Sequence, residues 1–160
     1  MAKTSDLSLP VRLFLRGYRW RRIDPVPFAA LTRPVEQCTV GLVSSAGFVL
    51  PGMASFDKGQ RGGDSSWRAI PGDADSSTLI DGHRSDAFDH RGMTSDPELA
   101  FPLRRLREFA EAGEIGAVAP HHASCMGAIT ATGQLVKETA PEIAARFVED
   151  QVDVALLVPV

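Results

Sequence analysis

The chain has 160 residues, of which 44% are hydrophobic and 23% are charged, and its formal net charge is −3. This length suits one domain with a single core, so we expect residues 1–34 to form a helix and a proline-rich connector and residues 35–160 to form the folded domain. The 17 Lys and Arg are offset by 20 Asp and Glu, which argues against nucleic acid as a partner.

The cysteines and the N-terminal segment indicate an intracellular protein. Cys38 and Cys125 lie far apart and form no CxxC pair, so the chain carries neither a zinc ribbon nor a thioredoxin-type motif. The first 30 residues carry charges throughout, and no stretch approaches the roughly 18 apolar residues of a membrane span. We expect a cytoplasmic protein that does not interact with membranes.

The first half of the chain predicts a helix, a strand, a loop and a second strand. Residues 7–16 should form a helix, because Leu9, Leu13 and Phe14 share one face. Residues 39–45 are apolar and bounded by small residues, which is typical of a strand buried on both faces of a parallel sheet. Residues 51–75 are rich in Gly, Ser, Asp and Pro and predict a long ordered loop, and residues 78–83 predict a strand.

The second half predicts two helices and a final strand. A helix is expected over 97–112, with Asp96 as its N-cap and Gly113 at its end. Another should follow Thr139 as N-cap, and residues 152–158 are apolar and short, as in a central parallel strand. The predicted fold class is therefore α/β, one domain with a mainly parallel sheet flanked by helices, and the last strand has no return segment in the sequence.

Two clusters carry groups that could do chemistry. His83, Asp86, Asp89 and His90 could bind a divalent metal or pair a carboxylate with an imidazole, but a polar loop held by its own hydrogen bonds is the alternative. In residues 120–127, His122 could activate Cys125, although a cysteine beside Met and Gly is commonly a small buried hydrophobe. The spacing matches no strong metal motif, and we predict no metal site.

Several segments together resemble a known family. The carrying stretches are VGLVSSAGF at 40–48, GDSSWRAIP at 63–71, HRS at 83–85, FPLRRL at 101–106, GEIG at 113–116 and ETAP at 138–141. In this order they resemble the selenoprotein B subunits of glycine, sarcosine, betaine and D-proline reductases, especially the shorter D-proline-reductase-like members. The likeness extends from about Arg33 to Val160.

The resemblance implies an oxidoreductase that reductively cleaves a C–N bond of a small amino acid or betaine-like compound. In the reverse direction, by which this class of enzyme is named, a disulfide is the electron acceptor. In the family, the strand that matches residues 152–160 is followed at once by selenocysteine or cysteine. A selenol is largely ionised at neutral pH, whereas a thiol with a pKa near roughly 8.5 is mostly protonated. The sequence ends one residue before that position, so we expect truncation at a recoded stop codon and an inactive chain.

The expected site lies at strand ends, where open α/β sheets bind ligands. We predict His83 and His122 as catalytic residues, and Ser44, Ser45, Gly47, Asp86 and Gly127 as substrate-binding residues. No cofactor is expected in this chain, while the resemblance implies a pyruvoyl group on a partner subunit. The expected partners are a small amine-bearing substrate, that reductase subunit and a second copy of the chain.

Two other functions fit the residues. The chain could be a non-catalytic binding domain that uses the pocket formed by the Ser44 turn and the His83 and His122 loops. It could also be a metal-dependent hydrolase that uses the His83 and His90 cluster.

Overall fold

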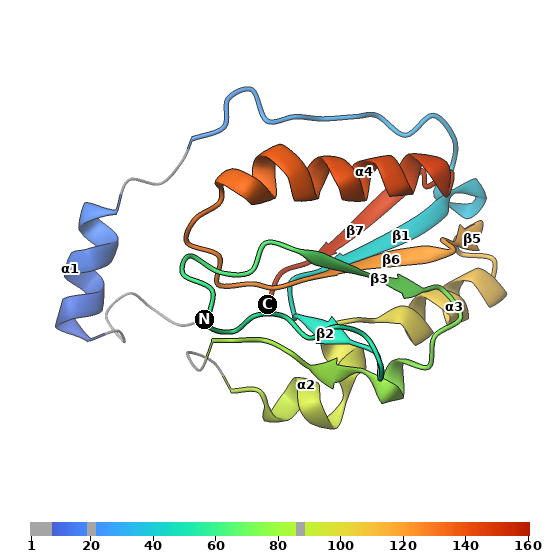
Figure 1. Ribbon diagram of the computed structural model, residues 1–160. Coiled ribbons are helices and arrows are strands. Elements are labelled where there is room, and N and C mark those ends of the chain that lie inside the picture. Colours follow the sequence, from blue (N-terminus) through green and yellow to red (C-terminus); the bar gives the residue numbers. More distant parts are fainter. Residues whose placement is uncertain (1–7, 19–21, 86–88) are drawn as a thin grey trace. The chain divides into compact units, whose positions relative to one another are not determined.

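The computed structural model describes residues 8–18, 22–85 and 89–160 (Figure 1). The chain divides into residues 1–30 and residues 31–160. The first unit contains helix α1 (Leu9–Gly17), which has Pro10 in its first turn and no buried residue. The helix predicted over 7–16 is confirmed for its described part, and residues 1–7 lie outside the described residues.

The second unit is built on a mainly parallel sheet. Strand β1 (Thr39–Ser44) pairs in parallel with β7 (Val154–Val158) along one side, and with β5 (Ala117–Val118) and then β6 (His121–Cys125) along the other. Strand β3 (Trp67–Pro71) pairs antiparallel with β6. The predicted α/β class, with a mainly parallel sheet flanked by helices, is confirmed.

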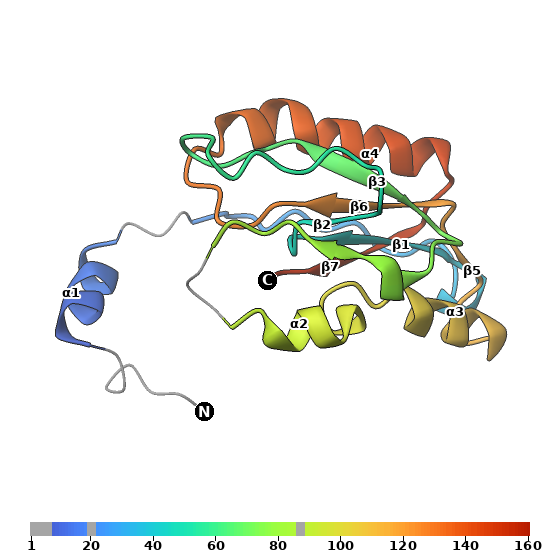
Figure 2. The ribbon, with the colours of Figure 1, turned by 60° about the horizontal axis from the view of Figure 1, so that its bottom comes forward.

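Helices cover both faces of this sheet (Figures 1 and 2). Helix α4 (Ala140–Glu149) lies on one face, and α2 (Arg91–Ser95) and α3 (Leu103–Glu111) lie on the other. A separate pair of short strands, β2 (Phe48–Val49) and β4 (Ile80–Asp81), is antiparallel and lies near α2. None of the described helices is long and apolar enough to cross a membrane.

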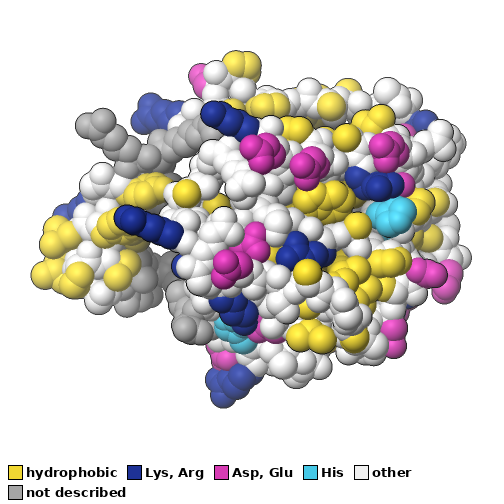
Figure 3. All heavy atoms as spheres, in the orientation of Figure 1, with side chains coloured by type: hydrophobic (Ala, Val, Ile, Leu, Met, Phe, Trp, Pro, Cys, Tyr) yellow, Lys and Arg dark blue, Asp and Glu magenta, His cyan; other side chains and the backbone are white. Residues whose placement is uncertain are grey.

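Two hydrophobic clusters hold the helices against the sheet. The cluster on the α2 and α3 face includes Leu42, Phe48, Phe101 and Leu103, all fully buried. The smaller cluster on the α4 face includes Ala123, Cys125, Ile143 and Phe147. Gly41 permits close packing there, because a Cβ at this position would come 2.9 Å from the Phe147 ring. On the surface shown in Figure 3, hydrophobic side chains lie between acidic and basic ones.

The predicted helix over 97–112 is wrong in its first half. Asp96 caps a short 3₁₀ turn, Pro97–Leu99, by accepting from the Glu98 amide, and α3 begins at Leu103. Pro102 causes the break, because a proline disfavours helical geometry in the residue before it. Gly113 has a φ of +72° directly after α3, as a helix-ending glycine should.

Thr139 is not a helix N-cap. Its backbone is helical, and its hydroxyl donates a 2.6 Å hydrogen bond to the Ser65 carbonyl instead of capping α4. The helical path begins earlier, with a wide π-type turn over Leu135–Thr139.

Four strands also differ from the predictions. Strand β3 lies inside the segment predicted as a loop, and β6 occupies residues that we had described as the His122 loop. The strand predicted over 78–83 is shorter, since Ser76–Thr78 forms a 3₁₀ turn before β4. Strand β7 is parallel, but it pairs with β1 alone among the described strands, and Leu157 is 67% exposed. It is therefore a partly exposed edge strand of this unit and not a central buried one.

Candidate functional site

Three parallel strands end at the same edge of the sheet, and the residues after them meet there. Ser45 follows β1, Gly127 lies two residues after β6, and Val160 lies two residues after β7. The Gly127 amide donates to the Ser45 carbonyl at 2.8 Å. This carboxyl edge is where open α/β sheets place their ligands.

Ser45 ties the end of β7 to the end of β1. Its amide donates to the Val158 carbonyl at 3.1 Å, and its hydroxyl accepts from the Val160 amide at 2.8 Å. The same hydroxyl lies 3.3 Å from the Val160 carbonyl oxygen, to which it donates. The backbone of Val160 is thereby held at a defined position.

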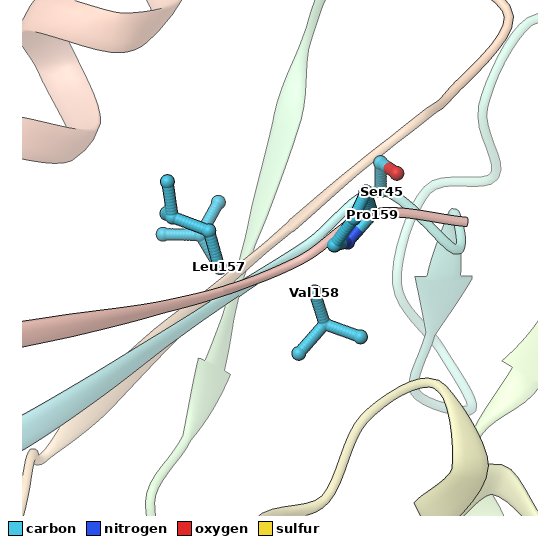
Figure 4. A pocket seen from close by; sticks show the side chains of 5 residues that line it. Ser45, Leu157, Val158 and Pro159 are labelled. Carbon is cyan, nitrogen blue, oxygen red and sulfur yellow. The ribbon is translucent and has the colours of Figure 1, made fainter. Parts of the chain in front are cut away.

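An apolar pocket of about 420 Å³ opens beside the hydrogen bonds that link Ser45 to Val158 and Val160 (Figure 4). It is lined by Val43, Ser45, Leu157, Val158 and Pro159. Leu157 and Val158 point to opposite sides of β7, as successive residues of a strand do. Apart from the Ser45 hydroxyl, the lining side chains are hydrocarbon, so the pocket suits the apolar part of a small molecule.

His83 reaches the same point from the segment that follows β4. A Cβ placed on Gly127 would lie 2.7 Å from His83 Nε2, 3.0 Å from the Val160 oxygen and 3.1 Å from the Ser45 carbonyl oxygen. The imidazole and the end of β7 therefore approach each other over the bare Cα of Gly127. This approach requires glycine at position 127.

Gly47 brings the His83 segment to the end of β1. Its amide donates to the Cys125 carbonyl at 2.8 Å, and its own carbonyl accepts from Gly82 at 3.0 Å. It has a φ of +69°, and a Cβ there would lie 3.1 Å from the His83 amide nitrogen. A side chain at position 47 would thus be strained and would displace His83.

His83 is buried and is held in a neutral form. Its amide donates to Asp81 Oδ1 at 2.8 Å, and its Nδ1 accepts from the Ser85 amide at 3.1 Å. Loss of hydration lowers the pKa of this imidazole, and the positive charge of His90 lowers it further. A neutral ring whose Nδ1 accepts must carry its proton on Nε2.

Two other predicted residues, Ser44 and His122, are fully buried beneath this edge. The Ser44 hydroxyl donates to the Ala100 carbonyl at 2.6 Å and accepts from the Ala46 amide at 3.2 Å. His122 Nδ1 accepts from the Leu42 amide at 3.0 Å, and burial lowers the pKa of this imidazole to about 4. Both side chains hold the strands together from below, whereas Ser45 and Gly127 lie beside Val160 and Gly47 packs against His83.

The acidic and histidine cluster is divided in the structure. Asp89 pairs with the exposed Arg91 at 2.6 Å, whereas His90 contacts Asp81 at 2.5 Å. Asp86 lies outside the described residues. Across the described ranges, no group of three or more His, Cys, Asp or Glu is placed to hold a metal ion.

Cys125 does not supply a thiolate near neutral pH. It is buried against the α4 face of the sheet, and this burial raises the pKa of its thiol to about 11. The sequence reasoning missed Asp81, which binds both the His83 amide and the His90 ring. The available signal was an acidic residue inside the strand predicted over 78–83, two residues before His83.

Comparison with known proteins identifies the family. The family model described as glycine/sarcosine/betaine reductase selenoprotein B matches residues 9–159. The chain belongs to this family. This selenoprotein B chain is similar to a curated protein, the D-proline reductase subunit gamma of Acetoanaerobium sticklandii, to which it is 33% identical over 136 residues.

That alignment covers 84% of the selenoprotein B family chain and 54% of the relative, so the chain spans about half the length of the curated protein it matches. No solved structure matches the chain. Residues 9–159, which the family model matches, contain every strand described above.

Proposed function

We propose that this chain is the substrate-side part of a selenol- or thiol-dependent reductase, which cleaves a C–N bond of a small amino acid or betaine-like compound. The observation that carries the proposal is the convergence of Ser45, Gly127 and His83 on Val160 at the carboxyl edge of the sheet. Family membership supports the reductase class, and the D-proline reductase relative supports a substrate with an amine next to a carbon that can be attacked.

The nucleophile in this proposal is a selenocysteine or cysteine directly after Val160. The Ser45 hydroxyl binds both the amide and the carbonyl of Val160, so the side chain of the next residue would start from a fixed point. That point lies beside the apolar pocket and near His83 Nε2. Fixed placement of a nucleophile beside a bound substrate is a large part of enzymatic rate enhancement.

The proposed reaction has two steps. The selenolate or thiolate attacks the carbon next to the amine, so a C–Se or C–S bond forms while the C–N bond breaks and its electron pair leaves with nitrogen, which takes a proton. A thiol of a dithiol reductant then attacks the selenium or sulfur, and the carbon leaves with the bonding pair and takes a proton. The dithiol is oxidised to a disulfide as the second thiol releases the nucleophile.

The chain's own residues would orient the substrate. The pocket lined by Val43, Leu157 and Pro159 would bind the hydrocarbon part of the substrate. Because these side chains are apolar, the charged groups of the substrate would face the His83 side or a partner subunit. A partner subunit with a pyruvoyl group would hold the amine.

A second copy of the chain is also part of the proposal. Leu156 and Leu157 on the outer strand β7 are 39% and 67% exposed, and apolar edge strands favour pairing with another segment. Light scattering of the purified 160-residue chain is expected to give a dimer or larger species. A monomer at all concentrations would contradict this part of the proposal.

The coding sequence and a matched pair of proteins test the nucleophile. We expect an in-frame TGA or a cysteine codon directly after the codon for Val160, followed by further coding sequence. Extended proteins with Cys or Ser at that position should differ in dithiol-dependent cleavage of the C–N bond of D-proline, followed as opening of the ring to a primary amine, with activity in the Cys form alone. A TAA or TAG codon, or equal activity of the Ser form, would refute the proposal.

A further inference from the structure

His90 lies in a socket made of two hydrogen-bond acceptors. Its Nδ1 is 2.5 Å from Asp81 Oδ2, and its Nε2 is 2.6 Å from the Ser85 carbonyl oxygen. A carbonyl oxygen only accepts, so Nε2 must carry a proton. The second nitrogen faces a carboxylate, which when ionised also only accepts.

If Asp81 is ionised, both contacts are hydrogen bonds only when each ring nitrogen of His90 carries a proton, whereas a neutral imidazole carries one proton in total. With Nε2 committed to Ser85, the short contact between Nδ1 and Asp81 must hold a second proton. An imidazolium beside a carboxylate supplies it and forms a charge-assisted hydrogen bond, which is shorter and stronger than a neutral one.

Asp81 and Ser85 also orient His83. Asp81 accepts from the His83 amide with its other oxygen, and the Ser85 amide donates to His83 Nδ1. The rings of His83 and His90 are 5.8 Å apart and nearly perpendicular. One carboxylate and one turn thus fix both rings, and the charge of the second ring opposes protonation of the first.

We propose that Asp81 and His90 form a fixed ion pair that holds His83 as a neutral Nε2–H donor, directed at the anionic atom of the residue that follows Val160. The role of that atom rests on the proposed function, whereas the states of the two histidines do not. A neutral imidazole N–H stabilises an anion without giving up its proton, so the anion stays nucleophilic. His83 is then a hydrogen-bond donor and not a general base.

The charges around this arrangement are consistent with it. Lys58, like His90, disfavours a second proton on His83, while Asp81 and the Ser85 backbone favour one. Desolvation together with His90 outweighs them, so the pKa of His83 is lowered. Asp89 is the other described carboxylate that interacts with His90, and it is exposed and already paired with an arginine. Asp86 lies outside the described residues.

Nitrogen-15 NMR of the histidine rings tests the states without any activity. The chain has four histidines, so single His→Gln variants assign each ring. At pH 7 we expect His90 to show both nitrogens protonated, and His83 to show a protonated Nε2 and an unprotonated Nδ1. A neutral His90, or a His83 with its proton on Nδ1, would overturn the proposal.

Two carboxylate variants separate the ion pair from general surface charge. Asp81→Asn should remove the second proton from His90 at pH 7. Asp89→Asn should leave His83 and His90 in the same protonation states, because Asp89 is exposed and pairs with Arg91. If Asp81→Asn left His90 fully protonated, the carboxylate would not hold the charge and the proposal would fail.

The donor role is tested in the extended protein with Cys after Val160. Removal of the donor by His83→Ala should slow alkylation of that cysteine by iodoacetamide at pH 7 by about tenfold, since a hydrogen bond to an anion shifts its pKa by about one unit. His83→Gln, which keeps an N–H, should recover part of that rate. Equal rates in all three proteins would refute the donor role, while NMR results as expected with no reductase activity would fault the proposed function alone.

Discussion

His122 makes the folded protein sensitive to acid. The ring is fully buried on β6, and its Nδ1 accepts from the Leu42 amide, so a neutral imidazole with its proton on Nε2 fits the site. A second proton on Nδ1 would break that hydrogen bond and place a charge in the core. Lowering the pH from 7 to 4 should therefore destabilise the fold through this one residue.

The size of the effect follows from the two pKa values. Burial lowers the pKa of His122 from 6.5 in the unfolded chain to about 4 in the folded one. At pH values between these, the unfolded chain binds more protons, so stability falls as the pH falls. The contribution is fully present above about pH 6.5 and is lost by about pH 4, and at 1.36 kcal/mol per unit it amounts to about 3 kcal/mol.

Urea denaturation at pH 7, 5.5 and 4 measures this loss. His122→Asn keeps an acceptor for the Leu42 amide but cannot titrate, so we expect a less stable variant whose free energy of unfolding falls by about 3 kcal/mol less between pH 7 and 4. His121→Asn on the same strand, where the ring is partly exposed and paired with Asp150, is the control and should keep the steep acid loss. Parallel curves for His122→Asn and the wild type would refute the reasoning.

Three further predictions concern single sites. Gly127→Ala should lower the free energy of unfolding by about 1–3 kcal/mol, because the new Cβ crowds the His83 imidazole. The control is Gly133→Ala, where a Cβ meets nothing within 4 Å, and it should cost less than about 1 kcal/mol. Equal melting temperatures of the two variants would argue against the close approach of His83 to Gly127. Thr139→Val should lower the free energy of unfolding by about 1–3 kcal/mol, because it leaves the Ser65 carbonyl without its hydroxyl donor. Thr139→Ser should recover most of this loss in thermal melts. Equal melting temperatures of Thr139→Val and Thr139→Ser would contradict a role for the hydroxyl. Cys125 should resist iodoacetamide at pH 8 in the folded chain and react after unfolding in urea, because burial raises the pKa of its thiol to about 11; rapid reaction in the native state would show that the thiol is accessible.

The sequence predicted the elements whose residues follow a simple pattern. Residues 39–44 are apolar and small, and they form the central strand β1. The apolar face of α4 was visible from Ile143 and Phe147, which are buried against the sheet. In both segments, local preference and tertiary burial favour the same structure.

The wrong strand predictions concern segments whose structure depends on contacts with residues far away in the sequence. The sequence of strand β6 is polar, since it contains two histidines and a serine. His122 is nevertheless buried, because the Leu42 amide of the neighbouring strand β1 donates a hydrogen bond to its ring nitrogen. Strand β3 lies in a Gly- and Ser-rich segment, and among the described strands it pairs with β6 alone, which its local sequence does not show. The edge position of β7 depends on which strands pair, and no property of its own residues reveals this.

The candidate site was foreseen in part. Turn residues at a strand end indicated Ser45 and Gly47, and the histidine cluster indicated His83. The sequence could not show that Gly127 leaves space for the imidazole, because this depends on a close approach of segments more than 40 residues apart. The pairing of Asp81 with His90 is likewise a tertiary contact, and it brings together the end of β4 and the start of α2.

The most direct test of the account is mass spectrometry of the protein isolated from cells that express its gene with selenium supplied. The tryptic fragment that begins at Phe147 contains Val160, because Arg146 is the last basic residue in the sequence. We predict that this fragment continues past Val160 and that its next residue is selenocysteine, with the isotope pattern of selenium, or cysteine. A fragment that ends at Val160, or one that continues with any other residue, would contradict the account.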